Sequence, residues 1–217
     1  MIALARTFRV LSLAALCASL SACISLLPKS DPSQLYRFDG ELRAETEAPA
    51  PRPATRFAVV RSGGGFVQAA SNDQIMTING DQVAYIAKAR WVSPASTLFN
   101  EAMTMAFNKN EGAARLLSRG EVGKADYALR VDVTRFEAIY DRGADAAPNI
   151  MVALRVTLVA ADRTLAGSDL LEANVRASDN RISAIVAAFD TAVGQVLNQL
   201  VTWTNQTGSA PAAAAAR

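Results

Sequence analysis

The sequence predicts an α/β domain, more closely α+β-like, in which helices pack on a sheet whose long strands are antiparallel neighbours. Two observations carry this prediction. Apolar and polar residues alternate through successive segments between Tyr127 and Ala177. This period of two residues is typical of strands that have one buried and one solvent-exposed face. An apolar stripe at helical spacing then runs from Ile182 to Trp203, which predicts a long C-terminal helix that covers the sheet.

Residues 1–22 have the layout of an export signal. Arg6 and Arg9 precede a nearly unbroken apolar stretch from Val10 to Leu20, and no acidic residue occurs before Cys23. The stretch is too short for a comfortable transmembrane helix, which needs about 20 residues. Cleavage after residue 22 leaves 195 residues, enough for one domain with a sizeable core.

The tetrapeptide Leu20-Ser21-Ala22-Cys23 closes this signal and fits the lipobox of a bacterial lipoprotein at all four positions. We therefore expect lipidation at Cys23, with palmitate among the acyl chains, and signal cleavage directed by the three residues before it. Two or more acyl chains anchor a protein stably where one does not. The alternative is an ordinary signal peptide with an incidental cysteine.

The composition of the mature chain excludes several classes of function. Without Arg6 and Arg9 it carries 20 basic and 20 acidic side chains, so it lacks the cationic footprint of a nucleic-acid-binding protein. Cys17 leaves with the signal, so no disulfide is expected. The chain has no histidine, which removes His-dependent triads and most zinc sites. No metal or cofactor is expected.

The mature chain begins with an irregular region. We assign residues 23–55 to the acylated N-terminus and a linker, because the stretch from Gly40 to Thr55 is polar and contains Pro49, Pro51 and Pro53. Such a linker would let the domain stand off from the membrane. A short strand at residues 34–38 is a candidate to join the domain. The globular domain is expected at residues 56–204, and a disordered tail at 205–217.

The domain should open with a strand and a hairpin. The apolar run Phe57-Ala58-Val59-Val60 predicts a strand covered on both faces. We interpret Gly63-Gly64-Gly65 as a flexible turn rather than a phosphate loop, because no Gly-Lys-Ser/Thr follows. Asn79-Gly80 lies between apolar segments at 75–78 and 83–86 and predicts a hairpin.

A helix should follow Pro94, with Ser93 or Ser96 as its cap. Apolar residues at spacings of one, three and four positions predict which side of this helix faces the core. They are Leu98, Phe99, Ala102, Met103, Ala106 and Phe107. A short second helical piece is expected over residues 112–119.

The second half has simpler patterns. Strands are expected at 127–133, continuing irregularly to Tyr140, at 150–158 and at 164–177, with a loop at 141–149 and a turn at Asp162-Arg163. Asp179 should cap the last helix. The stripe of that helix could also lie on a membrane, but its polar face has only Arg181 as a cation, so we favour packing on the sheet.

These segments together resemble a known family, the ABC-type transport auxiliary lipoproteins, also described as paraquat-inducible protein C-like outer-membrane lipoproteins. The resemblance covers nearly the whole mature chain but includes no catalytic motif. Its residues are the lipobox, Gln34-Leu35-Tyr36, Ala89-Arg90-Trp91-Val92-Ser93-Pro94, the segment from Tyr127 to Glu137, and Val201-Thr202-Trp203. Gly63-Gly64-Gly65 is a departure, since relatives more often have a proline-containing strand exit there.

The resemblance implies a mixed, largely antiparallel sheet with helices packed on it. It also implies partners: a periplasmic protein with mammalian-cell-entry (MCE) domains and an inner-membrane ABC permease and ATPase, which move phospholipid or related lipids between the two membranes. Ile24 follows Cys23 in place of the aspartate that commonly retains lipoproteins in the inner membrane. The family rule therefore implies the outer membrane of a Gram-negative bacterium, on its periplasmic face.

The leading hypothesis is a non-enzymatic accessory subunit, with homo-oligomerisation left open. Trp91 is the candidate partner contact, and the alternative is a core aromatic at a strand–helix junction. A second hypothesis is a lipid carrier whose core opens between the sheet and the terminal helix. A third is an envelope hydrolase, for which an acid–base pair would have to come from Asp132, Glu137, Asp162, Asp169 and Glu172.

Overall fold

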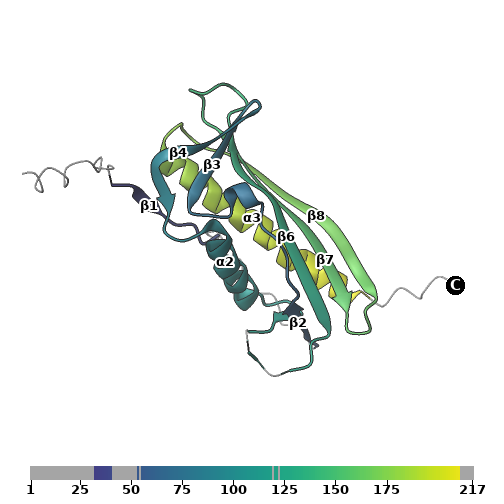
Figure 1. Cartoon of the computed structure of the whole chain (residues 1–217). Helices are drawn as coiled ribbons and strands as arrows, with labels where there is room; N and C mark the ends of the chain where they lie inside the picture. Colours follow the sequence, from purple (N-terminus) through teal and green to yellow (C-terminus); the bar gives the residue numbers. More distant parts are fainter. Residues whose placement is uncertain (1–31, 41–52, 54, 119, 122, 211–217) are drawn as a thin grey trace, which may run out of the picture. The chain divides into compact units, whose positions relative to one another are not determined.

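The computed structural model describes residues 32–40, 53, 55–118, 120–121 and 123–210. The segment from Ser33 onward forms one compact unit, whose elements are labelled in Figure 1. The lipobox, Cys23, most of the Pro-rich stretch and the tail from residue 211 lie outside the described residues. The expectations for those parts of the chain stay predictions.

Eight strands of the described residues form one mixed sheet, and its long ladders are antiparallel. β6 (Tyr127–Ile139), β7 (Asn149–Ala160) and β8 (Leu165–Arg176) follow one another as a meander, with β7 in the middle. Their core faces carry the apolar residues of the alternating pattern, because successive strand residues point to opposite faces. The predicted fold class is confirmed.

The N-terminal strands form a second group. β3 (Gln74–Asn79) and β4 (Gln82–Trp91) make the predicted hairpin, although its two-residue loop is Gly80-Asp81, one residue later than expected. β1 (Gln34–Tyr36) runs parallel to the end of β4, so the candidate strand does join the sheet. The compact unit therefore begins at Ser33 rather than at Arg56.

One edge of β6 supports two separate strand groups. β2 (Phe57–Arg61) pairs in parallel with the start of β6, and β3 pairs in parallel with its end. β5 (Ala114–Leu116) adds to the outer side of β2. The chain between β2 and β3 must therefore pass along the middle of β6, and the candidate site lies there.

Among the described residues, two α-helices cover this sheet. α2 (Ala95–Lys109) buries five of the six residues predicted to face the core, and Ala106 is partly buried. α3 (Ile182–Ser209) packs on β7 and β8 and also contacts α2 and β5. Figure 1 shows that this helix runs along the long strands of the sheet. Among the described residues, α3 alone is long and apolar enough to cross a membrane. Its apolar stripe packs on the sheet instead, as predicted.

Neither predicted helix cap is correct. The Ser96 hydroxyl donates to the carbonyl oxygen of Ser71 at 3.0 Å, and the first amide of α2 donates to the carbonyl oxygen of Asn72 at 2.8 Å. At α3, the Asp179 carboxylate pairs with Arg181 at 2.6 Å and the helix begins without a side-chain cap. The amide of Ala95 thus finds a backbone acceptor from a neighbouring turn, which makes a serine cap unnecessary.

The predicted helical piece at 112–119 is wrong, because residues 114–116 are strand β5. The Asn205 side chain on α3 explains the difference. Its Oδ1 accepts a hydrogen bond from the Ala114 amide at 2.8 Å, and its amide nitrogen donates to Asn110 Oδ1 at 3.0 Å. These long-range contacts hold the backbone beside β2, where strand pairing outweighs local helix propensity.

Two further expectations are corrected. Only Val59 of β2 is fully buried, and Val60 is 39% exposed, because the helices do not cover both faces of this strand. The last helix continues to Ser209, beyond the predicted end at residue 204. Its final turn is held in place, since the Tyr127 hydroxyl donates to the carbonyl oxygen of Gly208 at 3.0 Å.

Candidate functional site

The connection from β2 to β3 is an ordered part of the sheet edge, so its prediction as a flexible turn is wrong. The Ser62 amide donates to the carbonyl of Leu129 at 2.9 Å, and the Val67 amide donates to that of Val133 at 2.8 Å. In return the Val133 amide donates to the carbonyl of Gly65 at 2.9 Å. We call residues 62–67 the glycine segment, and it fills the gap between β2 and β3 along β6.

Gly64 explains why glycine occupies the middle of this segment. Its φ is +123°, a conformation that side chains with a Cβ rarely adopt. A Cβ at this position would lie 1.9 Å from the carbonyl oxygen of Val131. Only glycine lets the two backbones approach this closely.

Asp132 fastens the same segment from the side of β6. Its Oδ1 accepts the Gly65 amide hydrogen at 2.7 Å, and its two oxygens pair with the Arg130 guanidinium at 2.8 and 3.1 Å. The hydrogen bonds from Arg130, and then the one from Gly65, hold the pKa of Asp132 below its usual value against the opposing effect of burial. The ionised Asp132 carboxylate therefore holds the backbone of the glycine segment against β6.

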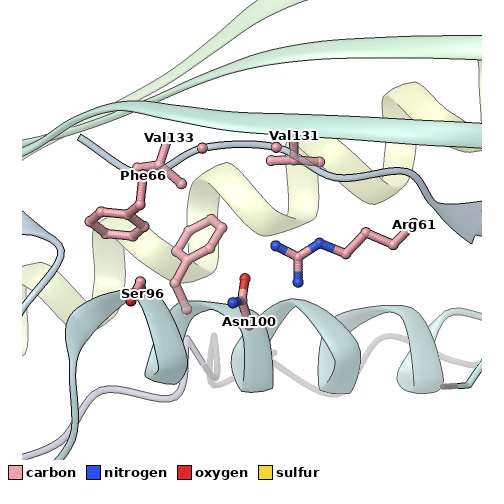
Figure 2. Close-up of a pocket in the computed structure, with 9 residues that line it drawn as sticks. Arg61, Phe66, Ser96, Asn100, Val131 and Val133 are labelled. Carbon is pink, nitrogen blue, oxygen red and sulfur yellow. The ribbon is translucent and has the colours of Figure 1, made fainter. Parts of the chain in front are cut away.

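A pocket of about 190 Å³ lies between the glycine segment, β6 and α2. Figure 2 shows Arg61 reaching from the end of β2 toward Asn100 of α2, with Ser96 one turn earlier on the helix. Phe66 lies at the far end of the pocket, below Val133. The full lining consists of Arg61, Gly64, Gly65, Phe66, Ser96, Phe99, Asn100, Val131 and Val133.

The pocket combines polar and apolar walls. Phe99, Val131 and Val133 are buried, and the rings of Phe66 and Phe99 meet edge-on with centroids 6.1 Å apart. Arg61, Ser96 and Asn100 add hydrogen-bonding groups, and none of the lining residues is acidic. The arrangement suits a small ligand with an apolar part and a hydrogen-bond-accepting part.

The sequence did not single out Arg61, Ser96 or Asn100 as site residues. The available signal was the glycine run itself, since glycine inside a strand pattern often marks close approach of another backbone or a ligand. Local turn chemistry, by contrast, predicts a flexible turn for this run. Ser96 and Asn100 are one helical turn apart, yet nothing in the sequence relates them to Arg61.

Trp91 is 1% exposed and lies in the aromatic core, which favours the alternative that the sequence left open. Its ring packs edge-on against Phe38 at 5.0 Å and against Phe189 at 5.4 Å between ring centroids. Phe136 lies next to all three rings. With this burial, Trp91 presents almost no surface to a partner.

The five candidate carboxylates are distributed over β6, the β7–β8 turn and β8, and none of them lines the pocket. Glu137 is 3% exposed, and its two oxygens contact the Arg135 guanidinium at 2.6 Å and the Phe136 amide at 3.0 Å. The hydroxyl and amide of Thr164 lower the pKa of Asp162. Among the described residues, no group of three or more potential ligands could hold a metal ion.

The interface between α3 and the sheet is closely packed. Phe189, Val193 and Val196 on the inner face of α3 are completely buried, as are Val152 and Leu154 on β7. Interiors packed in this way leave little space for an acyl chain. The described pocket lies instead at α2, so the packing gives no support to a carrier that opens between the sheet and the terminal helix.

The family to which the chain belongs is decided by its sequence match. The sequence profile of the ABC-type transport auxiliary lipoprotein components matches residues 42–201, from the Pro-rich stretch to the last helix. The chain belongs to this family. The family is described as an auxiliary component of ABC-type transport, and membership of this ABC transport auxiliary lipoprotein family implies a membrane-anchored location in the Gram-negative envelope.

Individual relatives of this auxiliary lipoprotein are distant. An uncharacterized protein of Bradyrhizobium diazoefficiens is 25% identical over 114 residues, and the match spans 52% of this chain but only 30% of that protein. A crystal structure of a DUF330 protein from Xanthomonas campestris superimposes with a TM-score of 0.67 at 22% identity, covering 81% of this chain and 97% of that one. A second crystal structure, of an uncharacterized protein, has a TM-score of 0.60 at 11% identity over 80% and 99% of the two chains. These two structures share the fold.

Proposed function

We propose that the protein is anchored through acylated Cys23 in the outer membrane and serves, on the periplasmic side, as a non-enzymatic accessory subunit of an ABC/MCE-type intermembrane lipid transport system. The observation that carries this proposal is the family match over residues 42–201. The lipobox at residues 20–23 supports the lipid anchor at Cys23. Ile24, directly after it, supports the outer membrane as the membrane that holds the anchor. The partners are an MCE-domain periplasmic protein and an inner-membrane ABC permease with its ATPase.

The position of β1 limits how far the domain can stand from its anchor. Cys23 precedes Ser33, the first residue of the compact unit, by ten residues. A fully extended chain spans at most about 3.6 Å per residue, so this tether reaches about 35 Å. The Pro-rich stretch from Gly40 to Thr55 connects two parts of the same unit and does not lengthen it. The domain therefore works close to the membrane that holds Cys23.

Two exposed apolar residues near the tether are better candidates for partner contact than Trp91. Leu35 of β1 is 62% exposed, and Val92 at the end of β4 is 51% exposed. The two strands are joined here, since the Val92 amide donates to the carbonyl oxygen of Tyr36 at 2.7 Å. Neither side chain contributes to the buried core, so substitution should not unfold the domain.

The use of the carboxylates supports a non-enzymatic role. Asp132 and Asp162 are held ionised by local hydrogen bonds, which suits fixed structural acceptors better than an acid that must donate a proton near neutral pH. Glu137 is committed to Arg135 and to the backbone. Hydrolysis of envelope substrates by the purified protein, lost in a carboxylate variant, would contradict this part of the proposal.

The test is a crosslinking pull-down of the tagged, acylated protein from intact envelopes, with identification of the captured proteins by mass spectrometry. We expect an MCE-domain protein together with its ABC permease, and loss of both with Cys23→Ala. Leu35→Ser and Val92→Ser should reduce capture, while Leu170→Ser, which changes a similarly exposed leucine on β8, should not. Capture of only unrelated outer-membrane proteins at good yield would overturn the proposal.

A further inference from the structure

We propose that the apolar surface of the β3–β4 hairpin docks on the lipid bilayer that holds Cys23, and that this contact fixes the orientation of the domain on the membrane. We call this surface the hairpin patch. Its members are Met76 and Ile78 of β3, Val83 and Tyr85 of β4, and Ile139 of β6. The proposal rests on the acylated anchor of the proposed function, but it does not depend on any transport partner.

The hairpin patch lies on one face of the sheet. Ile78 pairs with Val83 on β4 and with Ile139 on β6. Met76 pairs with Tyr85, one row further from the hairpin loop. Because residues paired across neighbouring strands share a face, these five apolar side chains form one continuous surface.

This surface faces away from the core. Ile75 and Ala138, each adjacent in sequence to a member of the patch, are completely buried. Successive strand residues point to opposite faces, so the patch occupies the other side of the sheet. Val83 is 58% exposed and Tyr85 is 39% exposed. Two large apolar side chains of one short hairpin are therefore open to a neighbouring surface.

The chain enters the compact unit from the hairpin side. β1 runs parallel to β4, and Gln34 pairs with Ala89, so β1 begins at the end that points toward the hairpin. Val83 precedes Ala89 by six residues, which is at most about 20 Å along the strand. The tether from Cys23 reaches about 35 Å. A membrane that holds Cys23 thus lies within reach of the hairpin patch.

A lipid surface fits the chemistry of the patch. Val83 has no hydrogen-bonding group on its side chain, and Tyr85 belongs to the residue types enriched at membrane–water interfaces. The Tyr85 hydroxyl donates to the carbonyl oxygen of Ala69 at 2.9 Å, so the ring is held in place before docking. The acyl chains supply the membrane affinity, and a small patch is sufficient to set the orientation.

The test uses the full acylated chain in phosphatidylcholine nanodiscs, after the intact mass has confirmed acylation of Cys23. Cys17 leaves with the signal and acylated Cys23 has no free thiol, so an introduced cysteine is the single labelling site. A nitroxide is attached to the Val83→Cys protein. Electron paramagnetic resonance then measures its collisions with oxygen, which concentrates in the bilayer, and with a water-soluble nickel complex.

The matched control is Leu165→Cys at the start of β8, because Leu165 is 64% exposed and thus similar to Val83. Leu165 pairs with Val159 of β7. Asn149, at the other end of β7, pairs with Ile139 of the patch. The two ends of β7 are about 30 Å apart. Figure 1 shows the β3–β4 hairpin and the β7–β8 turn at opposite ends of the long strands.

We expect the label at position 83 to collide several-fold less often with nickel, and more often with oxygen, than the label at position 165. Tyr85→Ser in the Val83→Cys protein should raise the nickel collisions, because it removes the ring next to the label. Tyr85→Phe keeps the ring, loses only the hydrogen bond to Ala69, and should leave the label shielded. Far-UV circular dichroism and the melting temperature show that each variant is folded.

Three results of the labelling experiment would overturn the proposal. Equal nickel collisions at the two labels in nanodiscs would show that the patch does not touch the bilayer. Shielding of position 83 in native envelopes but not in nanodiscs would show that a protein partner covers the patch. Spin–spin broadening at position 83 that disappears on dilution with unlabelled protein would show that a second copy covers it.

The outcomes also separate this proposal from the proposed function. Absence of acyl chains on Cys23 would remove the anchor and overturn both. An acylated protein whose label at position 83 is exposed to nickel would overturn the docking alone. A shielded label together with a failed envelope pull-down would overturn the transport partners and leave the docking in place.

Discussion

The Asp190 carboxylate on α3 accepts a hydrogen bond from the Gly40 amide at 2.8 Å, across 150 residues of sequence. The same oxygen accepts the Asp39 amide hydrogen at 2.9 Å. Phe38, the preceding residue, is buried against Trp91. Residues 38–40 are therefore built into the core and held against the last helix, directly before the Pro-rich stretch begins.

Replacement of Asp190 by alanine should destabilise the protein by about 2 kcal/mol, because two partly buried amides lose a charged acceptor. Urea unfolding monitored by circular dichroism measures this change. Asp179→Ala is the matched control, since Asp179 pairs with the exposed Arg181, and it should change stability by less than about 0.5 kcal/mol. Equal effects of the two variants would show that Asp190 does not fasten the segment.

Truncation of Trp91 to alanine should cost about 3–5 kcal/mol, because it empties the centre of the aromatic core. Trp91→Phe should cost clearly less, since it keeps a ring between Phe38 and Phe189. Chemical unfolding of the two variants measures the difference. A Trp91→Ala protein with normal stability that no longer captures its partners would instead place Trp91 at an interface.

Gly64→Ala and Gly63→Ala form a matched pair of neighbours. Both glycines have positive φ, at +123° and +77°, but a Cβ on Gly63 would meet nothing within 4 Å. Gly63→Ala should therefore cost about 1–2 kcal/mol from backbone strain alone. Gly64→Ala adds the clash with Val131 and should cost several-fold more. Similar melting temperatures for the two variants would contradict the close approach.

The stabilising effect of Asp132 should depend on pH. Arg130 and the Gly65 amide lower the pKa of Asp132 in the folded protein below its unfolded value of about 3.9. A lowered carboxyl pKa stabilises the fold above about pH 4, and this contribution is lost as the pH falls through the folded value. Asp132→Asn should thus be less stable than the wild type by about 1 kcal/mol at pH 7, and the difference should be smaller at pH 2.

The control for the Asp132 prediction is a double-mutant cycle with Arg130→Gln, measured by urea unfolding at both pH values. Removal of Arg130 takes away the main cause of the lowered pKa. The effect of Asp132→Asn should then shrink at pH 7. A difference between wild type and Asp132→Asn that stays constant from pH 7 to pH 2 would assign the effect to shape rather than charge.

Local periodicity predicts much of this fold. The alternation in β6 to β8, the apolar face of α2 and the stripe of α3 are each visible within one segment, because burial on one side of an element imposes a period of 2 or 3.6 on its residues. The hairpin was predicted for the same reason, since its turn chemistry lies between its two strands.

The candidate site was not predictable in this way. Its polar residues Arg61 and Asn100 belong to β2 and α2, and the glycine segment owes its shape to hydrogen bonds with β6, for example the one between Gly65 and Asp132, which are 67 residues apart. The conversion of residues 114–116 into a strand likewise depends on Asn205. A local pattern contains no information about such partners.

The sequence by itself determined the order of the main helices and strands and the family of the protein, and it predicts the export signal and lipobox, because each of these features depends on consecutive or periodic residues. The tertiary structure alone decided that Trp91 is a core residue, that the unit begins at Ser33, and that a pocket opens beside Gly64. These features depend on which distant residues share a contact, and packing of the whole chain settles those contacts.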